Sequence, residues 1–105
     1  MKIVKIIKSP VKNKRFRVYM DDEKYYDFGL DKPVNGTYID HHDNKIRDNY
    51  RNRHLGNRHE YELISTLTPS PSLFSYYLLW GDFTNINDNI KMLNKIFDYK
   101  KKYNL

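Results

Sequence analysis

The sequence predicts an α+β fold, in which a small N-terminal antiparallel β-meander of three to four strands is followed by three to four α-helices packed on it. Two observations lead to this prediction. Between residues 14 and 28, apolar and polar side chains alternate at a period of two, which is typical of half-buried strands. From residue 43 onward, the apolar positions recur at a period of about 3.6, which indicates helices.

Length and composition favour one small domain with an anionic partner. The 105 residues fit a single domain, in which residues 1–12 and 99–105 are candidates for extended arms. A net charge of +6 favours nucleic acid, an acidic protein face or lipid headgroups as the partner. The absence of cysteine excludes disulfides and thiolate metal sites. No apolar run approaches the roughly 20 residues of a membrane span.

Three strands are expected in the first 30 residues. Residues 2–8 are β-branched and apolar, and a Ser-Pro pair ends this segment. Residues 14–20 alternate cleanly, and residues 25–28 return after a polar turn. The inward side chains of the second and third strands are expected to be Phe16, Val18, Met20, Tyr26 and Phe28.

The change from strand to helix is expected between residues 35 and 44. The turn signal Asn35-Gly36 suits a tight hairpin, so Thr37–Ile39 is predicted to form a short fourth strand. The carboxylate of Asp43 is placed to accept hydrogen bonds from the free amides of a helix that begins directly after it. Gly56 is a suitable end for this first helix.

Three further helices follow in the prediction. The second covers residues 59–67, and the Ser-Pro pair at 70–71 is typical of the cap and first position of a third. Residues 73–80 are the most apolar run of the chain and predict a buried central helix. The last helix begins at a cap formed by Thr84 or Asn85. Its inward side chains are expected to be Ile86, Ile90, Leu93 and Phe97.

The first helix carries the candidate binding surface. Arg47 and Arg51 lie one turn apart, and the planar fork of arginine matches phosphate and carboxylate oxygens. Tyr50 beside them either stacks on a base or packs inward. The alternative is a solvated helix face without a partner. The complete candidate set for a protein or nucleic-acid partner is Arg15, Arg17, Lys45, Arg47, Tyr50, Arg51, Arg53 and Arg58.

Asp40-His41-His42-Asp43 is a candidate metal-binding run, because carboxylate and imidazole ligands suit zinc, manganese or iron. Its first part is similar to the Asp-His-His signature of a phosphoesterase superfamily, whose members take further ligands from separate strands of a larger domain. Asp40, His41 and Asp43 are the residues that a metal would use. The interpretation that the sequence favours has the two carboxylates capping a turn and a helix, with no cofactor.

Tyr76, Tyr77 and Trp80 could stack on bases of single-stranded nucleic acid, but their helical spacing in an apolar run favours a place in the core. The sequence has no cysteine nucleophile, no serine in an elbow motif and no glycine-rich phosphate loop. It therefore predicts a protein without enzymatic activity.

Several short motifs occur in a fixed order along residues 15–98. They are Phe16–Tyr19, Tyr26–Gly29, Tyr38–Asp43, Asn49–His54, Ser75–Gly81 and Asn89-Ile90. Together they resemble an uncharacterised, widespread family of small basic proteins of nucleocytoplasmic large (giant) DNA viruses. Members of that family often have lysine where this chain has His42, which weakens the metal interpretation.

The resemblance implies a viral setting and no particular activity. We expect a minor capsid or cement protein of the virion, present in the virus factory of the host cytoplasm during assembly. It would contact other virion or capsid proteins through its Tyr- and Arg-rich surface, and a strand edge could add to a neighbour's sheet. The alternative is a nucleic-acid-binding accessory or packaging protein that uses the basic helix. A metal-dependent phosphoesterase is a third possibility.

Overall fold

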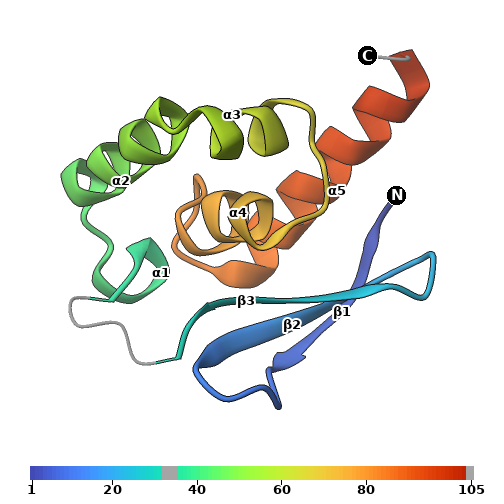
Figure 1. The fold of residues 1–105 in the computed structure, drawn as a ribbon, viewed down its shortest axis with the longest axis horizontal. Coiled ribbons are helices and arrows are strands. Elements are labelled where there is room, and N and C mark those ends of the chain that lie inside the picture. Colours follow the sequence, from blue (N-terminus) through green and yellow to red (C-terminus); the bar gives the residue numbers. More distant parts are fainter. Residues whose placement is uncertain (32–35, 104–105) are drawn as a thin grey trace.

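The computed structural model describes residues 1–31 and 36–103. Three antiparallel strands form one sheet in the order β1-β2-β3, and the helices lie on one side of it (Figure 1). This confirms the predicted α+β fold. The strands are β1 (Ile3–Lys8), β2 (Lys14–Met20) and β3 (Tyr25–Leu30). The helices are α1 (Tyr38–His41), α2 (Asn44–Gly56), α3 (Arg58–Ser65), α4 (Pro71–Phe74), the π-helix η1 (Ser75–Leu79) and α5 (Ile86–Tyr103).

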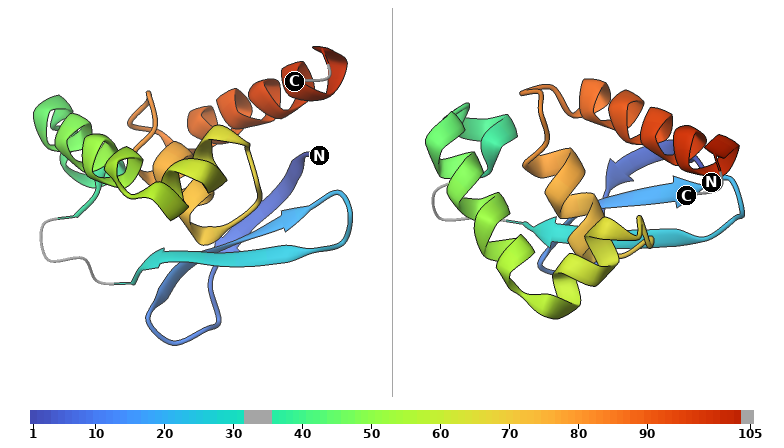
Figure 2. Two further views of the ribbon diagram at one scale, coloured as in Figure 1. Left: turned by 45° about the horizontal axis from the view of Figure 1, so that its top comes forward. Right: turned by 90° about the horizontal axis from the view of Figure 1, so that it is seen from above.

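The inner face of the sheet carries the side chains that the alternation predicts. Phe16 pairs with Phe28, and Val18 pairs with Tyr26, across β2 and β3. Val18 and Phe28 are fully buried, and the ring of Phe28 lies 5.8 Å from that of Phe74 on α4. The core therefore lies between the sheet and the α4–η1 segment, with α5 packed beside it (Figure 2). Its buried members outside the sheet are Tyr38, Leu73, Phe74, Leu78, Leu79, Trp80, Leu93 and Phe97.

Polar side chains cap α2, α3, α4 and α5, three of them at positions that the sequence indicated. The carboxylate of Asp43 accepts hydrogen bonds from the amides of the second and third residues of α2, at 2.9 and 3.1 Å. Ser70 caps α4, with proline at its first position. Of the two candidate caps of α5, Asn85 accepts the amide bonds. Asn57 caps α3 and was not predicted to do so.

The predicted fourth strand at Thr37–Ile39 is wrong. Thr37 begins helix α1 instead, because the carboxylate of Asp40 accepts hydrogen bonds from the amide and the hydroxyl of Thr37, at 2.8 and 2.9 Å. This reciprocal cap satisfies amides that a short helix leaves without partners. The first half of the predicted Asn35-Gly36 turn lies outside the described residues.

Two other expectations are corrected. Of the expected arms 1–12 and 99–105, the first contains strand β1 and residues 99–103 continue helix α5, whereas residues 104–105 lie outside the described residues. The predicted central helix is divided into α4 and a π-helical turn, in which the amide of Trp80 donates to the carbonyl of Ser75. Gly81 follows this turn, and a Cβ there would lie 2.1 Å from the carbonyl oxygen of Tyr77. The wide turn thus depends on glycine at this close approach.

Candidate binding surfaces

Arg15 links strand β2 to helix α1. Its guanidinium donates two hydrogen bonds to the carboxylate of Asp40, at 2.8 and 2.7 Å, and a third to the hydroxyl of Thr37 at 3.3 Å. The hydrogen bonds from Arg15, together with those from Thr37, hold the pKa of Asp40 well below its usual range. The donors of Arg15 are therefore directed at the protein itself.

Arg17 is held on the outer face of the sheet. It makes two hydrogen bonds to Asp27 on β3, at 3.0 and 3.1 Å, and its guanidinium lies 4.0 Å from the ring centroid of Tyr25. Asp27 also accepts a 2.6 Å hydrogen bond from the hydroxyl of Ser9. The bond to Asp27 raises the pKa of Arg17, and the same bond lowers the pKa of Asp27. Arg17 thus connects β2 and β3.

Arg51 ties helix α2 to the segment that follows η1. Its Nε donates to the backbone carbonyl of Trp80 at 2.7 Å, and its Nη2 lies 3.0 Å from the carboxylate of Asp82. The guanidinium also lies over the ring of Tyr76, 5.4 Å from the centroid. Only 19% of the Arg51 side chain is exposed. This arginine is an anchor of the fold.

Tyr50 and Arg47 also face the protein. The ring of Tyr50 stacks on that of Trp80, with centroids 4.0 Å apart and planes 10° apart. Burial raises the pKa of Tyr50 to about 12. Arg47 lies over the ring of Tyr38, 4.7 Å from its centroid, and pairs with Asp48 at 3.1 Å. Of the two alternatives for Tyr50, the structure places it inward.

His54 lies near the end of α2, close to the first turn of α3. Its ring lies 4.0 Å from that of Tyr50, and its Nδ1 lies 2.8 Å from the carboxylate of Glu60 without the alignment of a regular hydrogen bond. The stack of Trp80, Tyr50 and His54 fills the space beneath α2. Stacked aromatic rings add to the stability that burial alone provides.

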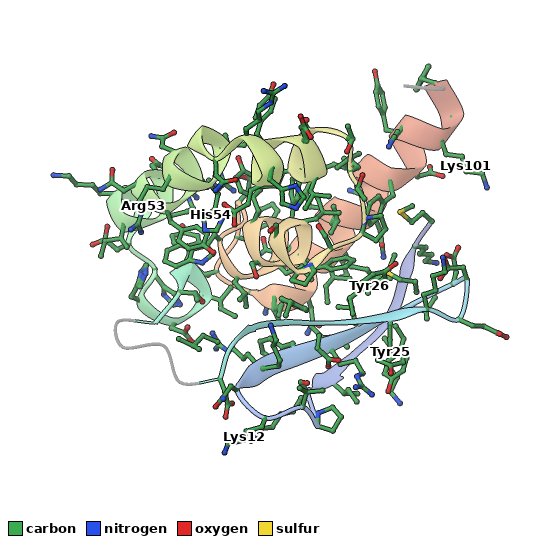
Figure 3. All side chains as sticks on the ribbon, viewed as in Figure 1. Lys12, Tyr25, Tyr26, Arg53, His54 and Lys101 are labelled. Carbon is green, nitrogen blue, oxygen red and sulfur yellow. The ribbon has the colours of Figure 1, made fainter. Side chains whose placement is uncertain are left out.

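The candidate set is therefore divided by the structure. Lys45, Arg53 and Arg58 are exposed, and the side chain of Arg58 is 93% exposed although it lies 3.6 Å from Glu62. Figure 3 shows Arg53 pointing away from the protein. The candidates that the structure directs at its own residues are Arg15, Arg17, Arg47, Tyr50 and Arg51.

The Asp40–Asp43 run does not bring its candidate metal ligands together. Asp40 is bound to Arg15, and Asp43 caps helix α2. His41 accepts the amide of Asp43 on its Nδ1 at 2.9 Å, and its ring lies 5.5 Å from that of Trp80. Within residues 1–31 and 36–103, no group of three or more His, Asp or Glu side chains is placed to hold a metal ion. Asp40 caps the single turn of α1 and Asp43 caps α2, which are the two capping roles that the favoured interpretation expected.

The aromatic run after residue 75 belongs mainly to the interior. Trp80 is buried, with only 7% of its surface exposed, and Tyr77 packs against the core. Burial raises the pKa of the Tyr77 hydroxyl. Tyr76 is partly exposed but carries the guanidinium of Arg51. The core interpretation of Trp80 is confirmed.

A groove that was not predicted from the sequence lies between the start of β1 and α5. Its volume is about 520 Å³, and exposed lysines from both segments line it. The signal was present, because Lys91 and Lys95 lie one turn apart on the polar face of the last helix. The polar and charged lining side chains are Lys2, Asp21, Lys91, Asn94, Lys95, Asp98 and Lys101.

Comparisons with known proteins place no function on these surfaces. Residues 4–54 match the family described as "Family of unknown function (DUF5754)". This segment runs from β1 nearly to the end of α2, so it includes the Arg15–Asp40 pair and Arg51 but not Trp80. Among curated proteins and among solved structures, nothing matched.

All the helices that the structure describes lie within residues 36–103. None of them combines the length and the apolar character that crossing a bilayer takes.

Proposed function

We propose that this chain is a non-enzymatic binding protein whose exposed lysines contact the phosphates of a nucleic acid. The observation that supports this proposal is that several arginines bind the protein itself, whereas the lysines of one groove remain exposed. Arg15, Arg17 and Arg51 are directed at carboxylates and carbonyls of the protein itself. The lysines that line the groove between β1 and α5 are exposed to solvent.

Lysine suits this partner for a physical reason. Its ammonium is a compact, hydrated point charge, which attracts phosphates without the planar two-point match that arginine offers. Contacts of this kind position a nucleic acid without reading its sequence. Protein interfaces, by contrast, are enriched in arginine and aromatic residues and depleted in lysine. Most of the arginines and Trp80 are already used inside this fold.

Direct titration tests the proposal. A fluorescently labelled single strand and a duplex of mixed sequence are titrated with the protein at low and rising salt, and anisotropy is measured. We expect binding whose logarithm falls linearly with the logarithm of the salt concentration, because bound phosphates release their counterions. Absence of binding to both probes at the lowest salt would contradict the proposal.

A structural role in the virion is the second candidate. It is supported by exposed tyrosines, which combine contact area with a hydroxyl group, and by the resemblance to small proteins of giant viruses. These tyrosines lie on three elements, with Tyr25 on β3, Tyr61 on α3, and Tyr99 and Tyr103 on α5. Purification of particles tests this role. A capsid or cement component is expected to remain with intact particles and to resist added protease.

A further inference from the structure

We propose that the groove between β1 and α5 is the place where the phosphates of a nucleic-acid strand bind, an inference that rests on the proposed function. We call it the lysine groove and define it by Lys2, Lys91, Lys95 and Lys101, with Asn94 between them. Its volume of about 520 Å³ lies within the range of roughly 300–1,000 Å³ that is usual for ligand sites.

The two walls of the lysine groove come from opposite ends of the chain. Figures 1 and 2 show the start of β1 beside the C-terminal half of α5. The two are joined by Asn94, whose Oδ1 accepts the amide of Ile3 at 2.8 Å and whose Nδ2 donates to the carbonyl of Ile3 at 3.1 Å. Asn94 thereby pairs with the strand edge much as a neighbouring strand would. This pairing fixes the distance between the walls before any ligand arrives.

The cations of α5 share one side of the helix. Lys91 and Lys95 are four positions apart, which is about one turn, and Lys101 lies six positions after Lys95 and lines the same groove. All three are exposed, as is Lys2 on the opposite wall. Lysines on both walls can therefore approach an anion between them, and such convergence concentrates positive potential in a groove.

Two carboxylates also border the lysine groove. Asp21 accepts a 3.1 Å hydrogen bond from the backbone amide of Lys2, so part of its charge is directed at the junction of β1 and β2. Asp98 lies on α5 between Lys95 and Lys101. Four lysines and two carboxylates leave an excess of positive charge. A chain of phosphates fits this arrangement better than a single dense anion, because the cations are spread along the seam.

A second groove between β1 and α5 carries much less charge than the lysine groove. It has a volume of about 220 Å³ and contains one lysine, Lys5, among mainly apolar neighbours on β1 and α5. The lysines along the contact between β1 and α5 are thus concentrated in the lysine groove. We therefore assign the phosphate contacts to the lysine groove and not to the β1–α5 seam as a whole.

A pair of charge-matched double variants tests this inference. Lys91→Glu/Lys95→Glu reverses two charges in the lysine groove, whereas Lys8→Glu/Lys12→Glu reverses two exposed charges at and just after the far end of β1. Figure 3 shows Lys12 and Lys101 on opposite sides of the molecule. Binding of a labelled single-stranded oligonucleotide is measured for both variants and the unaltered protein at several salt concentrations.

The groove variant is expected to bind about tenfold or more weakly at low salt, and the control variant to bind within about threefold of the unaltered protein. The neutral variant Lys91→Gln/Lys95→Gln is expected to lower the salt slope by about 1.4, the value for two lost single-strand phosphate contacts. All variants are expected to unfold at nearly the same denaturant concentration, because the altered side chains are exposed.

The possible outcomes distinguish the assignment of the lysine groove from the proposal that the protein binds nucleic acid. Equal weakening in the groove and control variants would overturn the assignment of the lysine groove and leave the proposed function standing. Failure of the unaltered protein to bind any probe would overturn both.

Discussion

Two basic regions of this protein use their charges in opposite ways. In the arginine-anchored region, Arg15, Arg47 and Arg51 turn toward carboxylates, a carbonyl and aromatic rings of the protein. In the lysine groove, Lys91 and Lys95 remain exposed. The planar guanidinium satisfies several partners at once and loses hydration readily, whereas the ammonium of lysine holds its water. Residues of equal formal charge thus have different roles in these two regions.

Helix α2 needs arginine contacts to hold it against the rest of the protein. No side chain of α2, all of whose residues are described, is buried. An amphipathic helix usually gains its stability from an apolar face, and α2 lacks one. Its attachment depends instead on Tyr50 stacked on Trp80 and on Arg51 bound to the Trp80 carbonyl. Trp80 is therefore the centre of the arginine-anchored region.

The largest effect is expected from Trp80→Ala. This change removes the surface on which Tyr50 stacks and leaves a cavity in the core, so the free energy of unfolding is expected to fall by about 3–5 kcal/mol. Urea unfolding followed by circular dichroism measures the loss. Tyr61→Ala is the control, because Tyr61 is half exposed and its loss is expected to cost about 0.5 kcal/mol or less. Equal losses in both variants would contradict the role of Trp80.

Arg51→Met is expected to have the next largest effect. The change keeps an unbranched side chain but leaves the carbonyl of Trp80 without its donor, which costs about 1–3 kcal/mol. The pair with Asp82 adds little, since that carboxylate is exposed. Arg53→Met, two residues further along α2, is the matched control and is expected to change stability by about 0.5 kcal/mol or less. A similar cost for both changes would show that Arg51 is not an anchor.

Asn94→Leu tests the wall of the lysine groove. Leucine has a similar size but cannot pair with the amide and carbonyl of Ile3, so a loss of about 1–2 kcal/mol is expected. Hydrogen exchange of the Ile3 amide measures the local effect, and its protection is expected to fall. Asn87→Leu on the exposed side of α5 serves as control. Unchanged protection of Ile3 would contradict the pairing.

The smallest effect is expected from Asp40→Asn, and it depends on pH. The folded protein lowers the pKa of Asp40, so the unfolded chain binds the proton first as pH falls. The stability that Asp40 provides is thus present above about pH 4 and is lost as the solution becomes more acidic. We expect Asp40→Asn to be less stable at about pH 7 and the difference to shrink toward about pH 2. A difference that stays constant with pH would contradict the ion pair with Arg15.

Much of the fold follows from local chemistry in the sequence. The alternation of β2 places Val18 inward, and the carboxylate of Asp43 begins α2. The prediction of a fourth strand was wrong because the Thr37–Asp40 cap favours a helical turn over an extended segment. A pattern of turn residues and β-branched side chains does not reveal that competition.

The binding surface was harder to predict, because periodicity does not report what a side chain contacts. Arg47 and Arg51 form a stripe in the sequence, but their partners Tyr38 and Trp80 come from other elements. Asn89 was also missed. It is almost fully buried on α5 and bonds to the backbone of Leu78 and Phe83. An asparagine within an apolar stripe was the signal that could have identified it.

The affinity of Arg51→Met for a labelled single-stranded oligonucleotide tests the division between the two regions most directly. It is measured at low salt and at a temperature where the variant is folded, beside Lys91→Gln/Lys95→Gln. We expect Arg51→Met to bind within about twofold of the unaltered protein despite its lower stability, and the lysine variant to bind more weakly despite normal stability. Loss of binding in folded Arg51→Met, with normal binding in the lysine variant, would contradict the account.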